Sequence, residues 1–99
     1  MTEVTYRHKD GLHEFSCVGH ADYGDAGKDI VCSAVSVLCS ALVISLAQLG
    51  YDSQVEDGKV EIAVDGYDTT EIKAIFKTVM NGFDLIAEQY PKNFKINQP

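Results

Sequence analysis

The chain has 99 residues, of which 45% are hydrophobic and 23% are charged, a composition typical of one small globular domain and not of a disordered segment. Its formal net charge is −7, from fifteen acidic residues against eight Lys and Arg. An acidic surface repels phosphate backbones and anionic lipids, so we expect no nucleic acid and no membrane as partner, whereas a basic protein remains a suitable one.

The chain contains three cysteines, Cys17, Cys32 and Cys39. An odd number of thiols cannot pair completely within one chain and is typical of the reducing cytoplasm, where we expect the protein to act. The first ten residues contain no apolar run, so they predict no signal peptide.

The first two predicted elements are strands over about residues 2–8 and 12–19. Asp10-Gly11 separates them, and this dipeptide is typical of a tight hairpin turn. Phe15 and Cys17 alternate with Glu14 and Ser16 in the second strand. We therefore expect Cys17 to point into the core beside Phe15 as an inert thiol.

A polar loop over residues 20–29 comes next, and an uncharged helix over residues 30–49 follows it. Asp29 is a good N-cap residue for this helix, and Gly50 is expected to end it. Twenty residues without a charge match a bilayer span in length, but four serines and a glutamine interrupt the run, and the strands on either side need an apolar cover. We therefore expect a central buried helix and no membrane span.

The second half of the chain repeats this order in outline. A hairpin over about residues 52–65 precedes an amphipathic helix that starts at Thr69 or Thr70 and runs to about Tyr90. A short strand at 94–96 ends the chain. The order ββαββαβ predicts one α+β domain over the whole chain, in which a sheet packs with two helices.

Cys32 is the first candidate for chemistry. With Asp29 as N-cap it would be the third helical residue, where free backbone N–H groups and the helix dipole favour a thiolate and would receive the oxyanion of a tetrahedral intermediate. Cys39 is two turns further along and is expected in the core. Ser36, one turn from Cys32, either hydrogen-bonds to the thiolate or bonds back to its own helix.

A nucleophilic cysteine needs a base, and His20 stands where the second strand meets the loop. The loop is long enough to bring His20 to the helix start, and a Cys–His pair is the minimum machinery for covalent acyl transfer. His8 and His13 instead flank the hairpin turn and are expected to be solvated. Spacing alone does not decide whether Cys32 and His20 form a catalytic pair, because a cysteine in an apolar helix and a histidine at a strand end are more often structural.

A zinc site is one alternative, since Cys17, His20, Cys32 and Cys39 are all potential ligands. The chain has no Cys-x-x-Cys pair and Cys17 is expected to face the core, so we expect no metal and no other cofactor. Two further classes remain open. A non-enzymatic assembly or interaction module would need no activated thiol, and a thiol redox sensor would use Cys32 without cleaving peptides.

The run from 19 to 38 closely resembles the signature of the bacterial ribosomal-processing cysteine protease family, Prp. That signature is Gly-His-Ala, a glycine-bearing loop, and then Asp-Ile-Val-Cys-Ala-Ala-Val-Ser. The resemblance implies that His20 is the catalytic histidine and Cys32 the nucleophile, and it places Asp29 and Ser36 at the acid and the terminal serine of the motif. Ser33 stands where alanine is common and keeps a small side chain.

The resemblance also implies a substrate and an assembly. The family that the chain resembles consists of homodimers. Its members remove a short N-terminal extension, ending in aromatic residues, from bacterial large-subunit ribosomal protein twenty-seven. A basic ribosomal protein would suit the acidic chain. The helix over 30–49 is apolar on nearly every face, and one small sheet cannot cover it all, which also favours a dimer.

The mechanism that we expect gives His20 the role of general base and later of acid, while Cys32 attacks the scissile carbonyl. Asp29 either orients His20 or only caps the helix. The loop from Tyr23 to Gly27 is a candidate lid over the substrate. Its expected hinges are Gly24 and Gly27, and Gly19 precedes it at the end of the second strand and is grouped with it.

Overall fold

The structure is a computed structural model that describes residues 1–19, 26–65 and 68–99. The elements in chain order are β1 (Thr2–Lys9), β2 (Leu12–Val18), α1 (Ala26–Gln48), β3 (Gln54–Glu56), β4 (Lys59–Asp65), α2 (Thr70–Gln89) and β5 (Phe94–Asn97). The predicted order ββαββαβ and the α+β class are confirmed.

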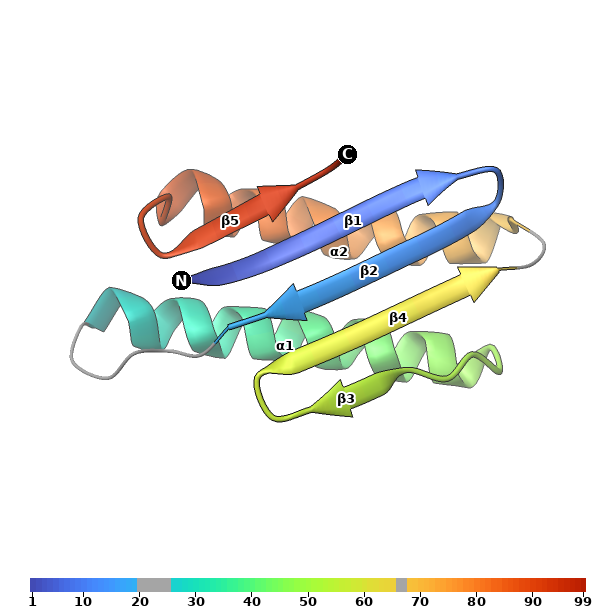
Figure 1. Cartoon of the computed structure of the whole chain (residues 1–99), viewed down its shortest axis with the longest axis horizontal. Helices are drawn as coiled ribbons and strands as arrows, with labels where there is room; N and C mark the ends of the chain where they lie inside the picture. The colour runs from blue at the N-terminus through green and yellow to red at the C-terminus, as the bar shows by residue number, and fades with distance from the viewer. Residues whose placement is uncertain (20–25, 66–67) are drawn as a thin grey trace.

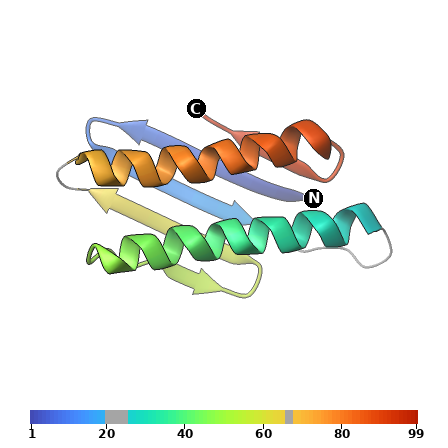
Figure 2. The same ribbon diagram turned by 180° about the vertical axis from the view of Figure 1, so that it is seen from behind.

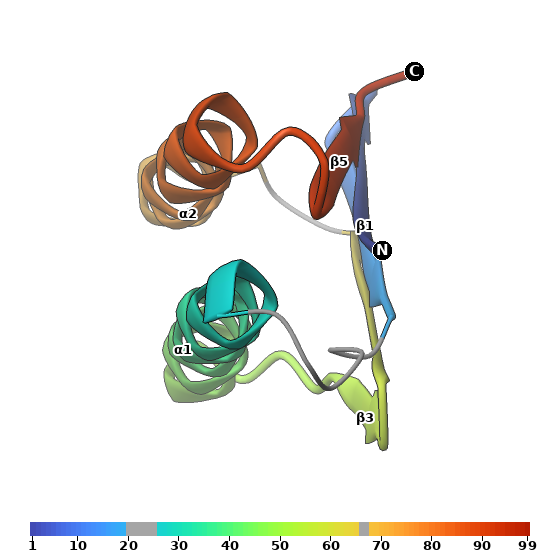
Figure 3. The same ribbon diagram turned by 90° about the vertical axis from the view of Figure 1, so that its left-hand side faces the viewer.

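The five strands form one sheet in the order β3-β4-β2-β1-β5 (Figure 1). Only β1 and β5 are parallel neighbours, and the other adjacent pairs are antiparallel. Both helices pack on the same face of the sheet, and the opposite face is left open (Figure 3). The fold is therefore a two-layer sandwich in which each β-hairpin leads into one covering helix.

The first hairpin turns at Asp10 and Gly11, which have φ angles of 54° and 80°. Positive φ at both central residues is what a tight two-residue turn requires. The turn pairs His8 directly with His13 across the strands, so both side chains lie on the same face of the sheet. This face is the helix-covered one. The prediction that both histidines are solvated is therefore wrong for His13, which is only 1% exposed.

The core lies between the sheet and the two helices. Among the α1 side chains that the structure describes, from Ile30 on, five are buried: Val31, Val35, Cys39, Leu42 and Leu46. Helix α2 contributes six: Ile72, Phe76, Val79, Met80, Phe83 and Ile86. The Phe83 ring stacks between Phe15 of β2 and Phe94 of β5, with ring centroids 5.7 Å apart in each pair. Cys17 and Cys39 are both buried, as predicted.

Helix α1 is not buried on all sides, so the prediction of a central buried helix is wrong. The sheet and α2 cover only one side of α1 (Figure 2). Ile30, Val37 and Ile44 lie on its uncovered side and are 53%, 68% and 57% exposed. By length and hydropathy alone the stretch Ile30–Gln48 would qualify as a membrane span. Its inner side nevertheless packs into the core described above, which is the role expected of a covering helix.

Helix α1 also begins earlier than predicted, at Ala26 and not after Asp29. Asp29 therefore lies in the first turn and is not the N-cap, and Gly27 belongs to the helix and not to a hinged loop. The physical reason is that an aspartate is favoured both at the N-cap and inside the first turn, where the helix dipole stabilises its charge. The residue type alone does not separate these two positions.

Candidate active site

A cavity of about 230 Å³ lies where α1 passes the end of β2 and the β3–β4 hairpin. Cys32 and Ser36 line it from α1, and Gly19 lines it from the end of β2. A larger hollow of about 630 Å³ on the open face of the sheet is lined by neither a cysteine nor a histidine. The smaller cavity is therefore the candidate active site, because it alone of the two is lined by cysteine thiols.

Cys32 is the accessible thiol of this cavity. It is partly exposed, whereas Cys17 and Cys39, which line the same cavity, are buried. The hydrogen bond to Cys17 and burial both raise the pKa of the Cys39 thiol. Cys39 is thus held as a neutral thiol in the core, and Cys32 is the cysteine that a substrate can reach.

The expected position of Cys32 in the first helical turn is wrong. Because α1 begins at Ala26, Cys32 is its seventh residue and lies about 9 Å along the helix axis from the start. Only the first four N–H groups of a helix lack intrahelical acceptors, and the dipole effect fades within the first turn. The free N–H groups at the helix start therefore do not surround Cys32 and do not form its oxyanion hole.

Gly19 closes the end of β2 beside the cavity. Its φ is +138°, and its N–H donates a hydrogen bond of 3.1 Å to the carbonyl oxygen of Gly58. A Cβ atom at this position would lie 2.7 Å from the Met1 carbonyl oxygen and 2.8 Å from the Thr2 Cα atom. Gly19 is thus a packed position, at which the missing side chain lets the N-terminal backbone approach closely.

The remaining predicted site residues are placed only in part. Ser36 is exposed and lines the cavity one helical turn from Cys32. His20, Tyr23 and Gly24 lie outside the described residues, as does the side chain of Asp29. The pairing of His20 with Cys32 and the choice between the two roles of Asp29 therefore stay predictions.

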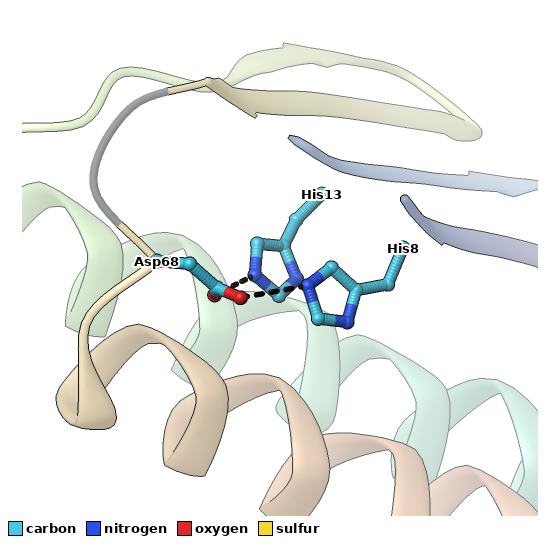
Figure 4. Close-up of side chains that lie close together, drawn as sticks. All are labelled: His8, His13 and Asp68. Atoms are coloured by element: carbon cyan, nitrogen blue, oxygen red, sulfur yellow. Dashed lines mark hydrogen bonds and ion pairs between the residues drawn. The ribbon is translucent and has the colours of Figure 1, made fainter. Parts of the chain in front are cut away.

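A second polar cluster lies at the opposite end of the sheet, where β1 turns into β2 (Figure 4). The Asp68 carboxylate accepts hydrogen bonds from His8 Nε2 at 3.1 Å and from His13 Nε2 at 2.8 Å. These bonds, that from His13 first, lower the pKa of Asp68. Tyr6 donates its hydroxyl to His13 Nδ1 at 2.7 Å, and burial together with the charge of Asp68 raises the pKa of Tyr6 to about 12.

We did not predict this cluster, although half of it was visible in the sequence. A two-residue turn at Asp10-Gly11 places His8 opposite His13, and the alternation that buries Phe15 also buries the residue two positions before it. Asp68 joins the cluster from the segment before α2, more than fifty residues further along the chain. No local pattern predicts a contact of that range.

Comparison with known protein families finds a match over almost the whole chain. A family model described as cysteine protease Prp matches residues 1–95. The ribosomal processing cysteine proteases Prp of Staphylococcus aureus strains Mu50 and NCTC 8325 are each 31% identical to the chain, over 96% of this chain and 94% of their own length.

Solved structures agree with that match. An essential ribosomal processing protease Prp from S. aureus, in complex with a substrate peptide, superposes with a TM-score of 0.87 at 25% identity and full coverage of both chains. The same S. aureus protease with a covalently linked product peptide gives a TM-score of 0.83 at 29% identity, again over both full chains. SMU.848 from Streptococcus mutans gives 0.74 at 28% identity, covering 100% of this chain and 96% of its own.

Proposed function

The chain belongs to the cysteine protease Prp family, and we propose that its substrate is bacterial large-subunit ribosomal protein twenty-seven, from which it removes a short N-terminal extension ending in aromatic residues. The observation that carries the site is that Cys32 and Gly19, the neighbour of His20, line one cavity. The net charge of −7 supports a basic ribosomal protein as substrate, because opposite charges steer the two together.

In the proposed reaction His20 takes the proton of the Cys32 thiol, and the sulfur attacks the scissile carbonyl carbon. When the tetrahedral intermediate collapses, the C–N bond breaks and His20 gives the proton to the departing amine. A thioester to Cys32 remains, and a water molecule activated by His20 hydrolyses it. The S. aureus relative has been solved with a covalently linked product peptide, which supports a covalent route.

We further propose that the protein acts as a homodimer in the cytoplasm. Three unpaired thiols support the reducing compartment. Ile30, Val37 and Ile44 support the dimer, because they follow one another at intervals of seven residues and form an apolar stripe along the outer side of α1. Seven residues are close to two helical turns, so the stripe is nearly straight and suits packing against a second helix.

The direct test is incubation of the purified chain with ribosomal protein twenty-seven that carries its N-terminal extension. We expect one cut that releases the extension, and no cut by the Cys32→Ala variant, whose fold stays intact because alanine is a good helix former at this position. Rapid quenching and mass spectrometry should find the extension bound to Cys32 as a thioester.

The two other functional classes predict different results in this test. An assembly factor would bind the ribosomal protein and leave it whole, and a redox sensor would leave it whole while its thiol changed oxidation state. Cleavage by Cys32→Ala at the wild-type rate would remove Cys32 from the mechanism.

A further inference from the structure

We propose that His8, His13 and Asp68 form a binding site for a divalent transition metal ion such as Zn²⁺, at the end of the sheet opposite Cys32. In the part of the chain that the structure describes, this is the only group of His, Cys, Asp and Glu side chains with ligand atoms close enough to share an ion. Two imidazoles and a carboxylate are a donor set that Zn²⁺ and Co²⁺ prefer.

The spacing of the three ligands suits a tetrahedral ion. One candidate donor atom from each residue lies within 4.8 Å of the other two. The Asp68 carboxylate oxygens lie 3.1 Å from His8 Nε2 and 2.8 Å from His13 Nε2. Bonds of about 2.0–2.2 Å to a tetrahedral metal separate the ligand atoms by about 3.3–3.6 Å. Only small movements are needed to replace the two hydrogen bonds by metal–ligand bonds.

His13 is the fixed ligand of the three. Its ring is almost fully buried and lies parallel to Phe76, with centroids 4.7 Å apart and planes 4° apart. Its Nδ1 is hydrogen-bonded to Tyr6, which leaves Nε2 as the nitrogen that faces Asp68. A hydrogen bond to the ring nitrogen that does not face the ion orients a histidine ligand and sets its tautomer.

His8 is the adjustable ligand. Its ring stacks on His13 with centroids 3.9 Å and planes 12° apart, so both Nε2 atoms point the same way (Figure 4). Two parallel lone pairs do not converge on one ion, so the His8 ring must tilt. Its side chain is 36% exposed and can do so without disturbing the core, and Asp68 is 27% exposed.

Proton balance is satisfied within the cluster. In the metal-free state each neutral ring carries its hydrogen on Nε2 and donates it to Asp68. On metal binding each ring takes the Nδ1–H tautomer, and His13 Nδ1 then donates to the Tyr6 oxygen. No net proton is released from neutral rings, and Tyr6 has a partner in both states.

The space around the cluster determines whether a fourth ligand fits, and the nearby charges determine how strongly an ion is held. A cavity of about 340 Å³ adjoins both histidines and has room for a water molecule as fourth ligand. Lys73 and Lys77 line it, and their charge opposes a cation, while Asp84 on the same wall partly offsets them. We therefore expect a site that gains and loses its ion readily and not a permanent structural zinc.

The test is a titration of the full chain and of its Cys32→Ala variant with Co²⁺, followed by visible absorption, and with Zn²⁺, followed by calorimetry. We expect one ion per chain, with the d–d bands of nitrogen and oxygen ligation and without a thiolate charge-transfer band. His8→Gln and Asp68→Asn, both at accessible side chains, should weaken binding by at least about tenfold, and Tyr6→Phe by about 10–100-fold.

Asp84→Asn is the matched control, since it removes one carboxylate from the same cavity without removing a ligand, and it should keep one bound ion per chain. Absence of binding to the folded chain would overturn the proposal. Binding that Asp68→Asn leaves unchanged, or that Cys32→Ala abolishes, would assign the ion to another site and would overturn it as well. Peptidase activity is measured in parallel and decides the proposed function independently.

Discussion

Solvent access separates the three cysteines of this chain more clearly than sequence position does. Cys17 and Cys39 face each other in the core, whereas Cys32 opens onto the cavity beside the end of β2. Thiol alkylation requires both access and a thiolate. The two buried thiols lack solvent access, so packing in the core keeps their reactivity low.

We therefore expect iodoacetamide to label Cys32 much faster than Cys17 or Cys39 near pH 6.5. At that pH a thiol with the ordinary pKa of about 8.5 is only about 1% ionised, so access and a basic neighbour dominate the rate. Mass-spectrometric mapping of the label against time measures it. Equal, slow labelling of all three thiols would contradict Cys32 as the nucleophile and leave the fold unaffected.

His20→Ala should lower the cleavage rate on the order of 10²–10⁴-fold, because it removes both the base and the proton donor. The same substitution should slow labelling of Cys32. His8→Ala is the matched control, since it removes an accessible imidazole at the far end of the sheet, and its cleavage rate should equal that of the wild type. A cleavage rate that falls in His8→Ala and stays normal in His20→Ala would show that His20 is not the catalytic histidine.

At the scale of elements, two glycines that end secondary structures have different physical roles. Gly19 and Gly50 both have positive φ angles, +138° and +92°. A Cβ atom added at Gly50 would have no heavy atom within 4 Å apart from those of Gly50 itself and its chain neighbours. At Gly19 the N-terminal backbone occupies that space. A left-handed conformation alone costs a non-glycine residue about 1–2 kcal/mol.

Gly50→Ala should therefore lower the free energy of unfolding by about 1–2 kcal/mol and leave cleavage by the folded protein unchanged. Gly19→Ala should cost more, because β1 must also shift away from β2, and it should reduce the activity of the protein that remains folded. Urea unfolding and cleavage assays on both variants measure this difference. Equal behaviour of the two variants would mean that the close approach at Gly19 does not position the site.

At the scale of the whole molecule, the outer side of α1 is the proposed dimer interface. We expect light scattering to report a dimer for the wild type and a monomer for Val37→Asp, which puts a charge in the centre of the exposed apolar stripe. Leu85→Asp is the control, since Leu85 is similarly exposed on α2 but lies outside the stripe, and this variant should stay dimeric. A monomeric wild type, or a dimeric Val37→Asp, would refute the proposed interface.

Most of the architecture was predictable because its causes are local. Two Asp-Gly turns, strict alternation in β2 and β4, and helical periodicity in α2 each depend on neighbours within a few residues. Thr69 caps α2, as one of the two predicted starts, and its side chain accepts a hydrogen bond from the Ile72 N–H. The burial of Cys17 followed from the alternation in β2.

The sequence by itself determined the order of the elements and the family to which the chain belongs, and it predicted Cys32 as the nucleophile. Only the tertiary structure decided which side of α1 is covered, because that helix is apolar all round and carries no pattern that distinguishes its faces. It also decided that Gly19 packs against the N-terminus and that Asp68 meets His13. Such contacts join segments far apart in the chain, and their partners are chosen by the packing of the sheet and helices, which no window of local sequence contains.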